Sequence, residues 1–521
     1  MSRRRGAALI GVLSLVGALI AVMPAKAGEP AAAELKWAAC PAEVNAKTAP
    51  LTAQCASLPV PLDYSDPGGA QISLLVSRIA STKPEKRRGI LLFNPGGPGG
   101  SGLDQPGFLA NKGLPVSVMD SYDLIGMDTR GVGHSTPMSC GLTEEIGYWA
   151  NVPPYAADDA AVTAQAKIAE KVAERCAAHD EQGQLRHLTT ANMARDLDRI
   201  RAALGERKAS FYGASYGSAL GAAYVSLFPD TTDRIVVDSN LADTHLDRDS
   251  LRRFARGVEE TFPDFARWAA ARHGSYGLGR TPAQVRRTYF ALAERLDKTP
   301  APDGTTGAIF RFLTFAHLYG DIQYGALARI WQSLLNPGAT ATSSASAATP
   351  ASAATPASAA TPASAATAAT AATAATAAAP VDNALTVFLA VTCNDVNWPE
   401  DLATYRRGVA EDRRRYPMFG AATANITPCA YWKHEPSEPP VKVDREGPAG
   451  VLMLQNRRDP VTPAINAELL RRKFGQRAKL VTADDSGHGV YVLGGNACAL
   501  NLTTAYLVDG TMPARDVTCR S

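Results

Sequence analysis

Ser215 has the local setting of a serine that acts as a nucleophile. It lies at the centre of Gly213–Gly217, which reads G-A-S-Y-G, a G-x-S-x-G pentapeptide. The apolar residues 209–212 before it suit a buried strand, and residues 218–225 after it suit a helix. A tight turn between strand and helix lifts the serine oxygen out of the sheet, and flanking glycines avoid collisions with both elements. The pattern therefore predicts a nucleophile; the alternative is a serine buried in a glycine-rich turn.

A base must lie next to this serine, because a serine hydroxyl is a weak nucleophile at neutral pH. His488 is the candidate, since it lies in a glycine-flanked loop directly after the apolar segment 479–482. Each of the other histidines comes before the serine, at or in the region predicted below as a helical cap, or in a proline-rich loop. They are His134, His179, His187, His245, His273, His317 and His434.

An acid must hold the tautomer of that histidine. Asp459 follows the predicted strand 450–455 directly, and the resulting chain order of serine, acid and histidine is that of α/β-hydrolases. The alternative makes Asp459 an ordinary turn residue before a proline. Asp484 and Asp485 are competing acids, but they lie so close to His488 in sequence that we expect them to shape its loop.

Acyl transfer also needs N–H donors aimed at the oxygen on which negative charge develops. We expect one donor to be the amide of Tyr216, the residue after the nucleophile. We assign the other to Gly97, in the glycine-rich loop 94–102, because glycines let the backbone approach a substrate closely. A phosphate-binding loop is the alternative there, but no G-K-[ST] follows. This chemistry needs no cofactor.

Alternating strands and helices must position these residues. Continuous apolar segments at 89–94, 122–128 and 234–238 are typical of strands buried on both faces. Residues 190–204 have the apolar spacing of a helix, with Thr190 as its N-cap. The succession predicts the α/β class: an α/β-hydrolase fold with a mainly parallel sheet, helices on both faces and an inserted helical cap.

Three segments of the mature chain follow from this pattern. Residues 28–239 are expected to form the first part of the core, 240–383 the helical cap, and 384–521 the second part of the core, with the acid and histidine. The cap contains a low-complexity tract of alanine, serine, threonine and proline at about 339–380. It has no large apolar groups to bury, so we expect a surface linker that proteases cut first.

The N-terminus has the features of an export signal. Three arginines at 3–5 precede an apolar run at 7–23 and Ala25-Lys26-Ala27, which predicts a signal peptide at 1–27 cleaved after Ala27. The alternative is an uncleaved anchor, although the run is short against the roughly 20 residues that span a bilayer. We expect a secreted or cell-envelope protein without a stable membrane anchor. The net charge of +3 and the lack of a basic tract beyond the N-terminus do not suggest nucleic-acid binding, and the oligomeric state stays open.

All eight cysteines lie beyond the predicted signal, and none forms the C-x-x-C pair of a zinc site. Disulfides are expected in an oxidising compartment, and free buried thiols are the alternative. Spacing alone does not determine the connectivity. Our hypothesis joins nearest neighbours: Cys40 with Cys55, Cys140 with Cys176, Cys393 with Cys429, and Cys498 with Cys519.

Taken together, these motifs resemble the tripeptidyl aminopeptidase and prolyl aminopeptidase group of secreted α/β-hydrolases. The resemblance covers roughly residues 38–335 and 384–520, and the low-complexity tract is a departure that leaves the cap geometry open. The segments that carry it are 94–99, 128–135, 213–217, 458–463, 487–489 and the C-terminal stretch Cys498–Cys519.

The resemblance implies a serine exopeptidase that releases short peptides, tripeptides above all, from free N-termini through an acyl-enzyme. The alternatives are a carboxylesterase that acts on ester or lipid substrates with the same triad, and a non-catalytic binding protein on a hydrolase scaffold. Arg130 either contacts substrate or supports the oxyanion strand, and we expect the second. An exopeptidase also needs a carboxylate for the substrate ammonium, for which the unranked candidates are Glu259, Glu260, Asp238 and Asp395.

Overall fold

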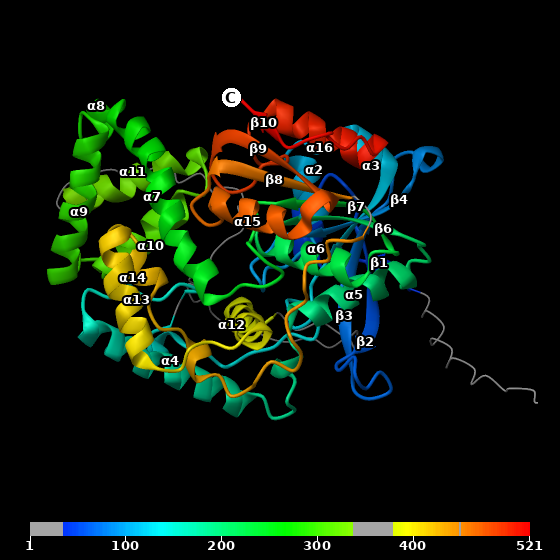
Figure 1. Ribbon diagram of the computed structural model, residues 1–521, viewed down its shortest axis with the longest axis horizontal. Coiled ribbons are helices and arrows are strands. Elements are labelled where there is room, and N and C mark those ends of the chain that lie inside the picture. The colour runs from blue at the N-terminus through cyan, green and yellow to red at the C-terminus, as the bar shows by residue number, and fades with distance from the viewer. Residues whose placement is uncertain (1–34, 149, 337–378, 448–449, 521) are drawn as a thin grey trace, which may run out of the picture.

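The computed structural model describes residues 35–148, 150–336, 379–447 and 450–520 (Figure 1). The predicted signal peptide at 1–27 lies outside the described residues. Nearly all of the low-complexity tract at about 339–380 lies outside them as well. Signal cleavage and a surface linker therefore stay predictions.

One sheet of ten strands forms the centre of the described chain, in the order β1-β2-β3-β5-β4-β6-β7-β8-β9-β10. The strands from β5 to β10 pair in parallel, whereas β1, β2, β3 and β5 pair antiparallel. The predicted mainly parallel sheet is confirmed. The strands are β1 Ala38–Ala39, β2 Gln54–Pro61, β3 Gln71–Ile79, β4 Gly89–Asn94, β5 Tyr122–Met127, β6 Ala209–Ala214, β7 Thr232–Asp238, β8 Val451–Arg458, β9 Ala478–Ser486 and β10 Val517–Cys519.

The central strands are buried on both faces, as their continuous apolar runs predict. In β4 every residue is buried. Because successive side chains of a strand point to opposite faces, Ile90 and Leu92 join one hydrophobic core, and Leu91 and Phe93 join a second core across the sheet. Each core is closed by its own layer of helices.

Helices cover both faces of the sheet (Figure 1). One layer consists of α2 (Gln105–Asn111), α3 (Val116–Ser121) and α16 (Ala497–Asp509), and the other of α5 (Thr190–Ala203), α6 (Tyr216–Leu227) and α15 (Ala464–Phe474). The N-cap of α5 lies one residue before the predicted Thr190. The side chain of Thr189, not Thr190, accepts the hydrogen bond from the amide of Asn192, because the backbone of Thr189 is still extended.

The described residues between β7 and β8 are mainly helical, and we call residues 239–450 the β7–β8 insertion. Helices α7, α9, α10 and α11 pack around the buried Trp331 beside the sheet, while α12 lies apart from them near α5 (Figure 1). The sheet resumes only at β8, so α12–α14 come between the low-complexity tract and the strand before the candidate acid. The helices are α7 Arg248–Ala270, α8 His273–Tyr276, α9 Pro282–Lys298, α10 Gly307–His317, α11 Tyr324–Leu335, α12 Asn383–Asp395, α13 Leu402–Arg415 and α14 Gly420–Thr423.

Four disulfides join the eight cysteines in nearest-neighbour order, as the hypothesis states. They are Cys40–Cys55, Cys140–Cys176, Cys393–Cys429 and Cys498–Cys519. None of the helices in the described ranges is long and apolar enough to cross a membrane.

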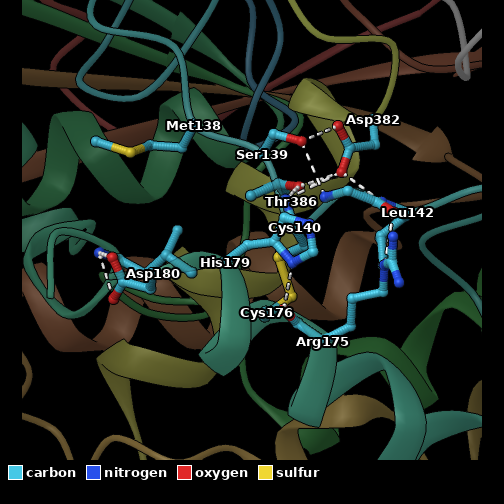
Figure 2. The surroundings of a disulfide bond; sticks show 12 residues. Met138, Ser139, Cys140, Leu142, Arg175, Cys176, His179, Asp180, Asp382 and Thr386 are labelled. Atoms are coloured by element: carbon cyan, nitrogen blue, oxygen red, sulfur yellow. Dashed lines mark hydrogen bonds between the residues drawn. A yellow bond between two sulfur atoms is a disulfide. The ribbon is translucent and has the colours of Figure 1, made fainter. Parts of the chain in front are cut away.

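The bond between Cys140 and Cys176 links the loop after β5 to α4 (Asp159–His179), as Figure 2 shows. The carboxylate of Asp382, at the start of α12, accepts hydrogen bonds from the amides of Cys140 at 3.0 Å and Leu142 at 2.9 Å (Figure 2). Three segments far apart in the chain, the β5 loop, α4 and α12, are thereby tied together.

Candidate active site

Ser215 occupies a strained turn between β6 and α6. Its φ of 59° and ψ of −124° are rarely adopted by a residue with a side chain, and such strain is typical of functional turns. A Cβ on Gly213 would lie 2.3 Å from the carbonyl oxygen of Gly217, and a Cβ on Gly217 would lie 2.7 Å from that of Asn94. The two glycines of the motif are therefore required by close packing, and the strand–turn–helix predicted around the serine is present.

His488 and Asp459 form a hydrogen-bonded pair. The imidazole Nδ1 lies 3.1 Å from Oδ1 and 2.9 Å from Oδ2 of Asp459, whose side chain is fully buried. The amides of Val461 and Thr462 each donate to Oδ1 at 2.9 Å, and the Thr462 hydroxyl donates to Oδ2 at 2.8 Å. The carboxylate is thus locked in place and holds the proton on Nδ1, which leaves Nε2 free to accept a proton.

The surroundings of His488 favour its charged form. Burial is the largest influence and lowers the pKa of the imidazole, but the negative charge and hydrogen bond of Asp459 and the charge of Asp238 raise it, and the net pKa lies above its ordinary value. The imidazolium that forms when the base takes a proton is therefore stabilised in place.

The end of β7 holds the serine turn and the histidine loop together. The main-chain carbonyl of Asp238 accepts from the amide of Ser215 at 2.9 Å, and its carboxylate accepts from the amides of Val490 at 3.0 Å and Tyr491 at 2.8 Å. The hydroxyl of Ser239 accepts from the amide after His488 at 2.8 Å. In the described part of the chain no hydrogen bond joins the Ser215 hydroxyl to His488, and such bonds often form only once substrate is bound.

The competing acids do not touch the imidazole. Asp484 forms ion pairs with Arg458 at 2.8 Å and Arg457 at 3.4 Å. Asp485 accepts a hydrogen bond from the amide of Ser486 at 2.8 Å. Both carboxylates therefore shape the loop of His488, and Asp459 is the acid that contacts it.

The glycine-rich loop after β4 lies against the serine turn. A Cβ on Gly96 would lie 2.5 Å from the carbonyl oxygen of Ala214 and 2.9 Å from Cβ of Ser215. The amide of Gly96 donates to Asn94, whereas that of Gly97 has no acceptor among the described residues. Tyr216 is the first residue of α6, where an N–H has no acceptor within its own helix. The two amides predicted as oxyanion donors are thus both available.

Tyr319 is a neighbour of the histidine that sequence reasoning missed. Its carbonyl oxygen accepts from the amide of His488 at 2.7 Å, and its ring meets the imidazole edge-on with centroids 5.2 Å apart. A Cβ on Gly487, whose φ is +117°, would lie 2.8 Å from that carbonyl oxygen. Tyr319 lies between α10 and α11, far from the triad in sequence, so no local pattern pointed to it.

The four carboxylates considered for a substrate ammonium are all engaged within the chain. Glu259 pairs with Arg286 and accepts from the amide of Met418, and Glu260 pairs with Arg256. Asp238 holds the histidine loop, as described above. Asp395 accepts two hydrogen bonds from Thr190.

Arg130 is fully buried and forms a bidentate ion pair with Asp196, in which Nε and one terminal nitrogen each lie 2.7 Å from a carboxylate oxygen. Its other guanidinium nitrogen donates to the carbonyl of Leu62 at 2.9 Å. These contacts support the structural interpretation of this residue over substrate binding.

Two family descriptions match the chain. That of the "alpha/beta hydrolase fold" matches residues 89–334, which include Ser215 and the glycine-rich loop. That of the "TAP-like protein" matches residues 416–519, which include Asp459 and His488. The two matches together cover every residue of the predicted triad and oxyanion hole.

Curated relatives align along nearly the whole chain. A "Tripeptidyl aminopeptidase" of Streptomyces lividans is 35% identical over 95% of this chain and 88% of its own. A "Carboxylesterase B" of Mycobacterium tuberculosis is 30% identical over 100% of this chain and 99% of its own. The "Serine protease Hip1" of the same species is 27% identical over 98% and 95%.

Proposed function

This chain belongs to the tripeptidyl aminopeptidase family of α/β-hydrolases and is a serine hydrolase, and we propose that it is an exported exopeptidase that releases tripeptides from free N-termini. The observation that carries the proposal is the buried Asp459–His488 pair, which the end of β7 holds beside the strained turn of Ser215. The aminopeptidase named among its relatives supports the choice of substrate.

In the proposed reaction the Ser215 hydroxyl attacks the scissile carbonyl while Nε2 of His488 takes its proton. Asp459 keeps Nδ1 protonated and stabilises the imidazolium. The amides of Gly97 and Tyr216 donate to the oxyanion of the tetrahedral intermediate. His488 then passes its proton to the leaving amine, and water attacks the acyl-enzyme with the same residue as base.

Residues 240–383 of the β7–β8 insertion are proposed to act as the cap that limits how far a peptide extends past Ser215. Two contacts support this role. The insertion reaches the base through Tyr319, and α7 packs so closely on the acid loop that a Cβ on Gly257 would lie 2.5 Å from the carbonyl oxygen of Asp459. The proposed division keeps 28–239 and 384–521 as core and 240–383 as cap.

Export is proposed from the signal-like N-terminus at 1–27. The four disulfides support it, because such bonds persist in oxidising compartments outside the cytoplasm. Sequencing the N-terminus of the mature protein tests this part: a start at Gly28 supports cleavage, and a retained Met1 refutes it.

A carboxylesterase is the second candidate, because the same three residues cleave esters and one relative carries that name. The decisive comparison uses a tripeptide anilide with a free amine, the same anilide with its amine acetylated, and a short acyl ester, at equal concentrations. Preference for the free-amine anilide supports the aminopeptidase. Preference for the ester together with indifference to acetylation overturns it.

A fluorophosphonate probe tests the nucleophile independently of substrate. Labelling of the protein at Ser215, and its loss in Ser215→Ala, supports the serine mechanism. A protein that folds but is not labelled is a binding protein on this scaffold.

A further inference from the structure

Asp395 is a buried carboxylate that the proposed reaction does not use. It is the last residue of α12 and is only 7% exposed. It accepts hydrogen bonds from the amide of Thr190 at 2.8 Å and from the Thr190 hydroxyl at 2.5 Å. Within the described ranges no lysine, arginine or histidine forms an ion pair with it. A buried charge without a counter-ion is costly, so its presence calls for a reason.

Holding the start of α5 is not a sufficient reason. The side chain of Thr189 already caps this helix by accepting the amide of Asn192 at 3.1 Å. A neutral side chain would serve the amide of Thr190 without the cost of burying a charge. Burial in fact raises the pKa of Asp395 to about 7, against the opposing effect of the Thr190 hydrogen bonds.

The hydrogen bonds of Asp395 continue to the residue after the nucleophile. The Thr190 hydroxyl lies 2.6 Å from the hydroxyl of Tyr216, and both side chains are almost fully buried. An ionised carboxylate only accepts, so Thr190 must donate its one hydrogen to Asp395, and Tyr216 must then donate to Thr190. The three residues form a relay with one direction, from Tyr216 through Thr190 to Asp395.

We propose that Asp395 is a positioning residue: through Thr190 it holds the phenol of Tyr216, and with it the main-chain amide of Tyr216 that donates to the oxyanion. The inference rests on the proposed function, in which Ser215 is the nucleophile and that amide an oxyanion donor. Because an oxyanion donor must be aimed at the transition state before the reaction begins, a buried anchor on its side chain contributes to kcat more than to substrate binding.

The relay has a second, weaker direction. The Tyr216 hydroxyl also lies 3.5 Å from the sulfur of Met193, a poor acceptor. If Asp395 carries a proton, or is replaced by asparagine, it donates to the Thr190 hydroxyl instead of accepting from it. Thr190 then donates to Tyr216, and Tyr216 is left with the sulfur. Asp395→Asn therefore reverses the relay at almost constant size.

Steady-state kinetics of the full-length protein test the proposal, with the tripeptide anilide or the short acyl ester, whichever it turns over. Asp395→Asn is expected to lower kcat by about tenfold or more, with KM within about twofold, since removing an oxyanion donor outright costs roughly 10²–10³-fold. Thr190→Val keeps the amide contact to Asp395 but lacks the hydroxyl, and it should show the same loss. This second variant also tests the proposal if Asp395→Asn does not fold.

Two further variants separate positioning from simple stability. In a Tyr216→Phe background the phenol is absent, so adding Asp395→Asn should cause no further loss of kcat. Thr189→Ala weakens the same helix start without touching the relay, so it should lower Tm and leave kcat unchanged. Additive losses in the double variant, or an equal loss of kcat in Thr189→Ala, would overturn the proposal.

The pH profile gives a readout that a structural role would not move. Two other titratable groups, Glu438 and His245, line the cavity beside Asp395, and both they and Tyr216 are the same in the wild type and in Asp395→Asn. The wild-type kcat should rise with pH through two ionisations, those of His488 and Asp395. In Asp395→Asn only the ionisation of His488 should remain in the profile. If kcat depends on pH in the same way on the acidic side of the profile for the wild type and for Asp395→Asn, the proposal is contradicted. Fluorophosphonate labelling separates the two hypotheses: an unlabelled wild type refutes the proposed function, whereas a labelled wild type matched in rate by Asp395→Asn refutes the relay alone.

Discussion

The amide of His488 donates a hydrogen bond across 2.7 Å to the carbonyl oxygen of Tyr319, which fastens the loop of the proposed base to the β7–β8 insertion. The ring of the same tyrosine lies edge-on to the imidazole. A shift of the insertion at this point would therefore move the imidazole or change its exposure to water. The helices between β7 and β8 are thus coupled to the chemistry as well as placed beside it.

The protonation of His488 should determine how kcat/KM falls as the pH is lowered. Its pKa is raised because Asp459 and Asp238 together outweigh the opposing effect of burial. The base works only when neutral, so kcat/KM should rise with pH through a midpoint above the ordinary histidine value of about 6.5. The ion pair with Asp459 also stabilises the fold below that ordinary value, and this contribution should be lost as pH rises through the higher, folded-state pKa. A kinetic midpoint below the ordinary value would contradict the prediction.

Removing the ring of Tyr319 should shift this midpoint upward. Burial lowers the pKa of His488, so Tyr319→Ala, which lets water reach the imidazole, should raise this pKa further. Tyr319→Phe keeps the ring and should leave the midpoint in place. Tyr276→Ala is the matched control, because Tyr276 packs on Trp268 in the same insertion. A downward shift, or an equal shift in the control, argues against shielding by Tyr319.

Replacing the acid should nearly abolish turnover. In Asp459→Asn the amide no longer holds the proton on Nδ1, so Nε2 is no longer kept free, and kcat should fall by roughly 10⁴-fold with little change in KM. Asp484→Asn is the control, since Asp484 pairs with arginines and not with the imidazole. Comparable losses in both variants would mean that Asp459 is not the acid of the triad.

Gly487→Ala should loosen the histidine loop. The added Cβ would lie 2.8 Å from the carbonyl oxygen of Tyr319, at a φ of +117° that side chains rarely adopt. We expect a loss of roughly 1–3 kcal/mol of stability, seen as a lower Tm, and a lower kcat. Gly495→Ala, on the same loop with nothing within 4 Å of its Cβ, should change neither. Wild-type behaviour of Gly487→Ala would show that this contact does not hold the base.

The disulfide Cys498–Cys519 should stabilise the end of the sheet. It closes a loop of 21 residues between α16 and β10. In the chain-entropy description its loss costs about 3 kcal/mol, so Cys498→Ser combined with Cys519→Ser should lower Tm under non-reducing conditions. Peptide mapping without reductant should recover all four nearest-neighbour cross-links, and a link between distant cysteines would refute the connectivity.

The local sequence was sufficient to predict the turn of the proposed nucleophile and the strands beside the proposed triad. Gly213–Gly217 encodes its own turn, because the collisions that its glycines avoid lie within the motif and the strand beside it. His488 and Asp459 were found from the chain order of the motifs and the strands before them. The disulfides follow nearest-neighbour order, in which each bond closes a short stretch of chain. The N-cap of α5 was predicted one residue too late, because Thr189 and Thr190 are adjacent and either threonine could cap the helix.

The tertiary structure alone decided what surrounds the triad. Tyr319 meets His488, Asp238 holds the loop after it, and Asp395 reaches Tyr216 through Thr190, although these residues lie far apart in the chain. No periodicity or motif encodes such contacts, because they depend on how the β7–β8 insertion and α12 pack against the ends of the strands. In the sequence, Asp238 and Asp395 could be identified only as unranked candidates for binding a substrate ammonium. Their separate contacts, Asp238 with the histidine loop and Asp395 with Thr190, result from that packing.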